Sequence, residues 1–320
     1  MDCSTHDIPA EDFHRRVRYG YALGLLGTTL FSMKSIIVKL IYASGVEPDT
    51  LLALRFAIAF PVYLFIGALS ARQSPQIERS KRNRLMISAM GLGILGYWLS
   101  SYLDFLGLQY IGAQFERMIL FTYPLLVMIL GFLIFGQRLP TTAILASLIS
   151  YFGLFLLFVQ GAQTGEEVFK GSSLVFCSAL TFALYQLYAK PVVMGLGASL
   201  STSIMMAAAC AASISVFLIR HDITSLILPP GLLALVAFLS LAGTVMPSFL
   251  LNMALARISS QANASIGTLG PIITIALAAA FLGEQVNILD ACGMVLVIIG
   301  VGWFSVAESP RKVINISLRR

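Results

Sequence analysis

The chain has 320 residues, of which 58% are hydrophobic and only 11% are charged, and its formal net charge is +6. A soluble chain carries roughly a quarter of charged residues to cover its surface, so the composition excludes a soluble globular protein. The apolar residues form runs near the length of about 20 residues that crosses a bilayer as a helix. Short alternating segments, which are typical of a membrane β-barrel, do not occur. We therefore expect an all-α integral membrane protein.

Ten apolar stretches follow one another along the chain, separated by turn residues such as "SGVEPD", "LPPG" and "LGEQVN". These predicted spans are 19–41, 50–70, 85–109, 112–135, 141–160, 171–193, 199–219, 232–254, 262–282 and 287–307. Fifteen basic residues lie near span ends on one side and three on the other, which predicts that both termini are cytoplasmic. The same distribution explains the positive charge without a nucleic-acid partner. Cytoplasmic tails are expected at 1–18, which lacks the features of a cleaved signal peptide, and at 308–320.

The two halves of the chain resemble each other. A shift of 147 residues places "QYIGAQFERMILFTYPLL" on "ARISSQANASIGTLGPII", so that Pro124 falls on Pro271. Near the start of each half, a shift of 151 places Lys39 on Lys190. Each half contains five spans, and because five is odd, the second copy must cross the membrane in the opposite sense. We expect two inverted five-helix repeats, at 19–160 and 171–307, an architecture of secondary transporters in which the substrate binds near the midplane.

The ten-span pattern resembles the drug/metabolite transporter superfamily, and within it the EamA-type permeases. The resemblance is carried by "LQYIGAQ", "YPLL" and "FGQRL" in the first half and by "LARISSQ", "GPII" and "LGEQV" in the second. The segment "LRFAIAF", which contains Arg55, also looks like the second helix of the family. The chain departs from a strict repeat at Gln137, which corresponds to Glu284, and at Arg55, which has no counterpart in the second half. The resemblance implies export of a small metabolite such as an amino acid.

Five ionisable side chains lie inside spans of the first half, at similar depth in the outer third of the membrane: Lys34, Arg55, Asp104, Glu116 and Arg117. A charged side chain at the centre of a membrane helix costs about 2.5–3.5 kcal/mol, so these groups must pair with one another or line water. Asp104 and Arg117 stand on adjacent antiparallel helices. A salt bridge that locks these two spans is one interpretation, and direct contact with substrate is the other.

Further polar residues share helix faces with these charges or correspond to them in the repeat. The candidate substrate-binding residues are Lys34, Arg55, Asp104, Glu116, Arg117, Tyr97, Tyr123, Tyr185, Asn252, Asn263 and Thr268. For the tyrosines, helix packing or anchoring at the membrane interface is the alternative. One side of the expected cavity is charged and the other carries hydroxyls and amides, which suits a zwitterionic or anionic molecule. Pro124 and Pro271 remove helix hydrogen bonds in mid-span and are candidate hinge or kink positions.

Motifs for other functions are absent or misplaced. "GLGILG" at 91–96 matches a dinucleotide-binding pattern but lies inside an apolar helix, where close helix packing explains the glycines. No nucleotide-binding G-x-x-x-x-G-K-[ST] motif occurs, the histidines lie outside the spans, and the cysteines have no metal-site spacing.

We therefore expect a secondary transporter of the bacterial inner membrane that works by alternating access without ATP hydrolysis. It is expected to have no catalytic residue, metal or cofactor, and its partners are a small molecule and the lipid bilayer. Glu116 or Asp104 is the candidate carrier of a coupled proton, and uncoupled transport is the alternative. The other function classes left open are a channel and an intramembrane sensor or enzyme.

Overall fold

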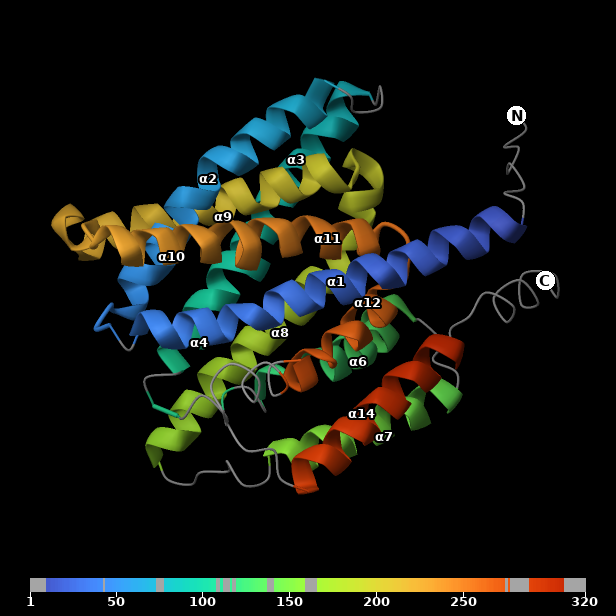
Figure 1. Ribbon diagram of the computed structural model, residues 1–320. Helices are drawn as coiled ribbons and strands as arrows, with labels where there is room; N and C mark the ends of the chain where they lie inside the picture. Colours follow the sequence, from blue (N-terminus) through green and yellow to red (C-terminus); the bar gives the residue numbers. More distant parts are fainter. Residues whose placement is uncertain are drawn as a thin grey trace.

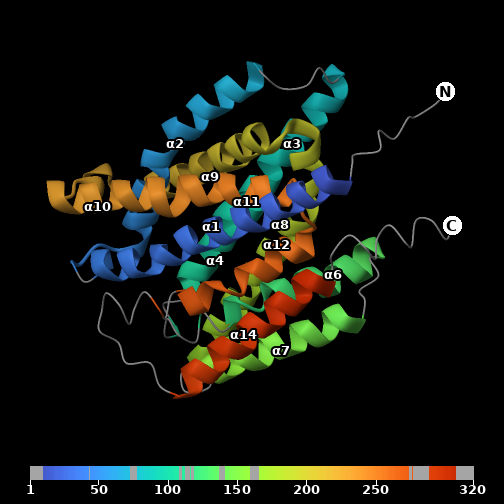
Figure 2. The same ribbon diagram turned by 45° about the vertical axis from the view of Figure 1, so that its right-hand side comes forward.

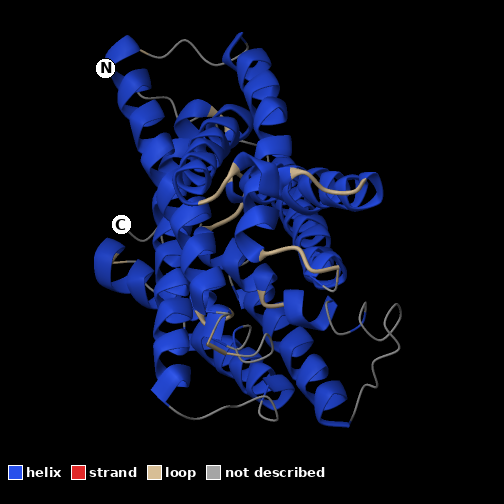
Figure 3. Ribbon diagram, turned by 90° about the vertical axis from the view of Figure 1, so that its left-hand side faces the viewer, coloured by secondary structure: helices blue, strands red, loops and turns tan. Residues whose placement is uncertain are grey.

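The computed structural model describes residues 10–42, 44–72, 78–107, 110–111, 116, 119–136, 141–158, 166–273, 276 and 288–307. Within these ranges the chain is helical apart from short turns, and Figure 3 shows no strand among them. The expectation of an all-α protein is confirmed for this part of the chain.

The helices of the first half are α1 (Ala10–Tyr42), α2 (Pro48–Arg72), α3 (Arg79–Gly93), the π-helix η1 (Ile94–Leu99), α4 (Ser100–Gly107), α6 (Tyr123–Phe135) and α7 (Thr141–Phe158). Those of the second half are α8 (Glu166–Leu196), α9 (Ala198–Arg220), the 3-10 helix η3 (Ile223–Leu226), α10 (Pro230–Ser240), the π-helix η4 (Leu241–Val245), α11 (Met246–Leu255), α12 (Ser260–Gly267) and α14 (Ile288–Ala307).

Each predicted span coincides at least in part with one of these helices. The spans at 85–109 and 232–254 correspond to α3–η1–α4 and α10–η4–α11, in which a π-helical turn interrupts an otherwise continuous helix. The spans at 112–135 and 262–282 are covered only partly, because some of their residues lie outside the described ranges. α1 begins at Ala10, so the helix extends into the segment that was expected to be a tail.

Among the described residues, five helical segments are long and apolar enough to cross a membrane: Asp49–Arg72, Arg79–Gly107, Glu167–Leu196, Ala198–Arg220 and Pro230–Leu255. Shorter apolar stretches are Tyr123–Phe135, Ile144–Leu156 and Ala291–Phe304. Large apolar side chains such as Phe65, Ile87, Phe132 and Phe155 are exposed on these helices. Extended apolar exposure is rare on soluble proteins and is expected where helices face lipid.

The pattern of helix packing is preserved when the two halves are exchanged. α2 packs along α9 and α7 along α14, so corresponding helices of the two halves are paired. α1 packs against α10, η4 and α11 as α8 packs against α3, η1 and α4. Figure 1 shows α7 and α14 side by side at one edge of the molecule, while α1 and α8 run through its middle. Corresponding helices of the two halves therefore have corresponding neighbours.

The interruptions of the helices also fall at corresponding positions. The π-helix η1 begins at Ile94 and η4 begins at Leu241, and these residues are related by the shift of 147. Turns replace the helix at 121–122 and at 268–269, which the same shift relates. π-helical turns are rare and often occur at functional sites, so their recurrence at corresponding positions supports the relation between the two halves.

The turns before α2 and α9 correspond as well. Gly45 has a φ of 82° and Gly197 a φ of 84°. Glycine adopts this left-handed conformation without the steric cost that a Cβ atom causes. Each half therefore uses the same device to reverse the chain between its first and second long helices.

The two ends of the helix bundle differ in charge. The first turn of α1, the last turn of α14, the start of α3 and the α8–α9 turn lie at one end, on the right in Figure 1 and again in Figure 2. That end carries the described basic residues Arg15, Arg16, Arg18, Arg72, Arg79, Lys81, Arg82, Arg84, Lys190 and Arg257. The opposite end carries Glu47, Asp49, Glu167 and Asp222 together with Lys170 and Arg220.

Candidate functional site

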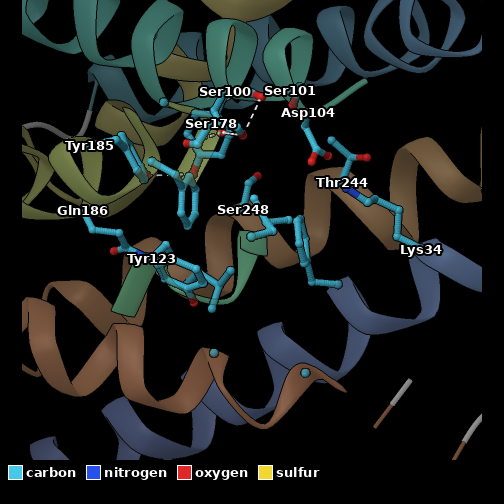
Figure 4. A pocket seen from close by; sticks show the side chains of 18 of the residues that line it. Lys34, Ser100, Ser101, Asp104, Tyr123, Ser178, Tyr185, Gln186, Thr244 and Ser248 are labelled. Carbon is cyan, nitrogen blue, oxygen red and sulfur yellow. Dashed lines mark hydrogen bonds between the residues drawn. The ribbon is translucent and has the colours of Figure 1, made fainter. Parts of the chain in front are cut away.

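A cavity of about 150 Å³ lies between the two halves of the chain. Side chains from α1, α2, η1, α4, α8, α9, η4, α11 and α12 line it, together with residues at the start of α6. Figure 4 shows polar side chains pointing into it from α4 (Ser101, Asp104), α8 (Ser178, Gln186) and α11 (Ser248). An engineered cavity of about this volume binds benzene, so the space suits a small organic molecule.

Eight of the eleven candidate residues line this cavity: Lys34, Arg55, Tyr97, Asp104, Tyr123, Tyr185, Asn252 and Asn263. Thr268 is buried but is not part of the lining, and its hydroxyl donates to the Ser265 carbonyl at 2.7 Å. Glu116 is 2% exposed and also lies outside the lining, where other groups of the protein interact with it. Arg117 lies outside the described residues, so its pairing with Asp104 stays a prediction.

Two opposite charges in the lining have polar atoms without a hydrogen-bond partner among the described residues. These atoms are Nε of Arg55 and Oδ1 of Asp104. Arg55 is only 4% exposed, and its guanidinium carbon lies 4.8 Å from the centroid of the Phe56 ring. A cation–π contact offsets part of the cost of burying the charge. Because a buried polar group without a partner is costly, these two atoms are candidates to bond a ligand or water.

Lys34 brings a second cation to the cavity. Its Nζ lies 4.4 Å from the centroid of the Phe31 ring, one turn earlier on α1. Figure 4 shows the amine of Lys34 and the carboxylate of Asp104 both directed at the space beside Thr244. Among the described residues, the first half thus supplies two cations and one anion to the lining.

A closed network of neutral hydrogen bonds joins the two halves at the cavity. The hydroxyl oxygens of Tyr97 and Tyr185 are 2.7 Å apart, and the Tyr185 hydroxyl donates to Oδ1 of Asn252 at 2.9 Å. The Asn252 amide donates to the Tyr97 hydroxyl at 3.1 Å and to the Ser248 carbonyl at 3.0 Å. Three segments, η1, α8 and α11, therefore meet at one side of the cavity, and this network fixes how the halves are placed there.

Two further polar pairs complete this side. Ser178 donates to the Ser100 carbonyl at 2.8 Å and Ser100 donates to the Ser178 carbonyl at 3.2 Å, which ties α4 to α8. The Asn263 amide donates to Oε1 of Gln186 at 3.2 Å. Oδ1 of Asn263 has no hydrogen-bond partner in the described part of the chain, so the cavity also offers a neutral acceptor.

The helix break before Pro124 lies next to the cavity and is filled by a tyrosine hydroxyl. The Leu125 N–H donates to the Tyr151 hydroxyl at 2.8 Å, and that hydroxyl donates to the Phe121 carbonyl at 3.2 Å. In an uninterrupted helix, Leu125 would donate directly to Phe121. Tyr151 of α7 therefore replaces one bond of the helix ladder with two. At the corresponding break before Pro271, the Thr268 hydroxyl donates to a carbonyl of its own helix, as the Thr122 hydroxyl does at the first break.

Residues that the repeat relates lie together around the cavity. The shift of 147 pairs Tyr97 with Thr244, Ser101 with Ser248, Asp104 with Leu251 and Tyr123 with Gly270, and all eight residues line it. The shift of 151 adds Phe31 with Phe182 and Lys34 with Tyr185. The cavity is thus lined by repeat-related residues of both halves.

Several lining residues were not among the candidates. They include Thr28, Ser32, Ser178, Gln186, Met206, Thr244 and Ser248. The repeat carried a signal for Thr244 and Ser248, which correspond to residues of the first half that face the cavity. Met206 corresponds to Arg55 under the shift of 151, but a methionine in an apolar span is also typical of ordinary packing.

The glycines of "GLGILG" are partly explained by packing. A Cβ at Gly93 would overlap the Met205 carbonyl, and a Cβ at Gly96 would overlap the Tyr185 ring. Gly91 faces open space. The interpretation as a close helix contact is confirmed for Gly93 and Gly96, which press η1 and the end of α3 against α8 and α9.

Comparison with known proteins shows the family of the chain. The model of the EamA-like transporter family matches twice, at residues 18–159 and 169–306. The chain is 31% identical over 286 residues to "Uncharacterized transporter YcbK" of Bacillus subtilis (strain 168), which covers 87% of this chain and 90% of that protein. It is 24% identical over 281 residues to "Uncharacterized transporter YyaM" of the same organism, with 87% and 90% covered.

A solved crystal structure has the same fold, with a TM-score of 0.75 at 16% identity, over 92% of this chain and 98% of that chain. The double match spans most of the sequence, and the apolar helices place the protein in a membrane. The chain belongs to the EamA-like transporter family and is an integral membrane transporter.

Proposed function

We propose that this protein is a secondary transporter of a small metabolite that works by alternating access without ATP hydrolysis. The observation that carries the proposal is a cavity lined by repeat-related residues of both halves, such as Ser101 with Ser248. Two similar units around one cavity can exchange conformations, so that the cavity opens first to one side and then to the other.

The proposed architecture is ten membrane spans in two inverted five-helix repeats, at 19–160 and 171–307, with cytoplasmic tails at 1–18 and 308–320. Its support is the exchange symmetry of the helix pairs and the recurrence of the π-helices at Ile94 and Leu241. The concentration of basic residues at one end of the bundle supports a cytoplasmic location for that end. The Bacillus relatives support a bacterial plasma membrane.

The proposed substrate is a zwitterionic or anionic small molecule such as an amino acid, moved outward. Arg55 and Lys34 are positioned to hold an anionic group and Asp104 a cationic one. The breaks before Pro124 and Pro271 are proposed hinges, because a helix that lacks a continuous ladder bends there at lower cost.

Counterflow in proteoliposomes tests this function. Vesicles loaded with one unlabelled amino acid at a time should accumulate the same labelled amino acid transiently when it is a substrate. A channel gives no such accumulation, so its absence across the panel would contradict carrier-type transport of amino acids. Ser101→Leu fills the cavity and should abolish counterflow. Ser173→Leu, on the exposed face of α8, is the matched control and should retain it.

Direction and coupling need a separate measurement. Cells loaded with the substrate should lose it faster when they express the protein, as expected of an exporter. An imposed pH gradient should change the rate if Glu116 or Asp104 carries a proton. A rate that is insensitive to the gradient and to Glu116→Gln would remove the proton role from Glu116.

A further inference from the structure

The two halves present different chemistry to the cavity at corresponding positions. Asp104 of α4 corresponds to Leu251 of α11, and both line the cavity. α2 contributes the cation Arg55, whereas α9, the corresponding helix, contributes Met206. At these two positions the first half carries a charge and the second half an apolar side chain.

Met206 is held firmly in its place in the lining. It is 1% exposed and belongs to an apolar cluster with Phe56, Tyr63 and Val245. Tyr63 is itself fixed by a hydrogen bond of 2.9 Å between its hydroxyl and that of Ser248. A rigidly packed side chain limits the space beside it, because protein interiors tolerate little overlap.

Leu251 is fixed from the other side. A Cβ at Gly27 of α1 would lie 3.0 Å from Cγ of Leu251, so the leucine already occupies the full space between α1 and the cavity. It cannot withdraw from the cavity toward α1 without displacing that helix. Met206 and Leu251 are thus two apolar side chains that close packing holds in place.

We propose that Met206 and Leu251 are specificity-determining residues that limit the size of the substrate's apolar group, while Arg55 and Asp104 of the first half hold its charged groups. The inference rests on the proposed transport function. The substrate class is a small zwitterion with one short apolar side chain. Its anionic group faces the free Nε–H of Arg55, its cationic group faces Oδ1 of Asp104, and its apolar group lies against the second half.

The charged residues Arg55 and Asp104 and the apolar residues Met206 and Leu251 affect selectivity in different ways. The charged groups bind the part that all members of the class share, so they set affinity without sorting by size. Burial of one methylene of the ligand raises its affinity by a factor of about four until the space is filled. A larger group then collides with Met206 and Leu251. Replacing Met206 or Leu251 by a smaller residue should therefore make ligands with longer side chains bind best.

Thermal stabilisation of the purified protein by glycine, alanine, norvaline, norleucine and phenylalanine tests the proposal, since a ligand that binds only the folded state raises the melting temperature. Met206→Ala should raise the affinity for norleucine relative to alanine about tenfold, and Leu251→Ala should act in the same direction. Met206→Phe should shift the ratio toward alanine. The matched control is Met205→Ala, a buried methionine next to Met206 that lies outside the lining and should leave the ratio unchanged.

An unchanged rank order of ligands in all the variants at 206 and 251 would overturn the proposal, as would the absence of stabilisation of the wild-type protein by every member of the series. If Met206→Ala does not fold, Met206→Phe and Leu251→Val still test the ratio. Failure of the proposed transport function gives a different result: the variants still shift the norleucine-to-alanine binding ratio as expected, but no amino acid of the series shows counterflow.

Discussion

The two halves of the cavity share their geometry and differ in their chemistry. Helix pairs, π-turns and helix breaks recur at corresponding positions, yet the first half places Lys34, Arg55 and Asp104 in the lining where the second places Tyr185, Met206 and Leu251. The symmetric features are those that two exchanging units need. The residues that break the symmetry are where recognition of a substrate is expected, because a perfectly symmetric site presents the same groups from both sides.

The two helix breaks show the same contrast on a smaller scale. Both breaks contain a threonine that bonds within its own turn, Thr122 in the first half and Thr268 in the second. Only at the first break do the described hydrogen bonds include a hydroxyl from a neighbouring helix, that of Tyr151 on α7. The second break contacts α14 through apolar packing of Leu269 and Ile272. We therefore expect the first break to be coupled to α7 by hydrogen bonds and the second to α14 by apolar contacts.

The largest effect is expected at Asp104. Asp104→Asn should lower the free energy of unfolding by about 3–5 kcal/mol if Arg117 is its partner, because removal of one member of a buried pair leaves the other charge uncompensated. Adding Arg117→Gln should restore part of this loss. Chemical unfolding of the two single variants and the double variant measures the coupling, and strictly additive losses would contradict the pair.

Arg55→Met makes the first half resemble the second. Charge-assisted hydrogen bonds contribute about 1.5–3 kcal/mol, so initial counterflow rates should fall about 10- to 150-fold at low substrate concentration. The melting temperature should stay the same or rise, since a buried cation is removed. Arg220→Met, at an exposed arginine that bonds Tyr102, is the control and should transport normally. Normal transport by Arg55→Met would show that the charge serves another purpose.

Tyr151→Phe and Thr268→Val compare the two breaks. Loss of the Tyr151 hydroxyl leaves the Leu125 N–H and the Phe121 carbonyl without their partner, at a cost of about 1–3 kcal/mol. Thr268→Val should cost less, because it removes a single bond to a carbonyl that lies within its own helix turn. Denaturant unfolding gives both values, and a larger cost for Thr268→Val would reverse the comparison.

Tyr185→Phe is expected to have the smallest effect. It removes the hydroxyl that the second half offers where the first has Lys34, and with it the bonds to Tyr97 and Asn252. Those two side chains still bond each other, so the cost should be about 1 kcal/mol. A loss as large as that of Asp104→Asn would indicate that the neutral network, rather than the charges, holds the site together.

The sequence predicted the positions of the helices and eight of the lining residues, because polar side chains in apolar spans are expensive and therefore conspicuous. It did not predict Met206 or the small Ser178, whose side chains look like ordinary packing until their neighbours are known. The sequence also did not predict the role of Tyr151, because the helix break that Tyr151 fills lies on another helix. Glu116 shows the reverse case, because a buried charge at the right depth lies outside the cavity.

Cysteine accessibility on the two sides of the membrane tests the central claim most directly. Ser101 and Ser248 correspond in the repeat and both line the cavity. Single cysteines at these positions, in a protein whose native cysteines are replaced, should react with a membrane-impermeant thiol reagent in right-side-out and in inside-out vesicles. Substrate should protect both. Reaction from one side only, at both positions and in every condition, would contradict alternating access to a shared cavity.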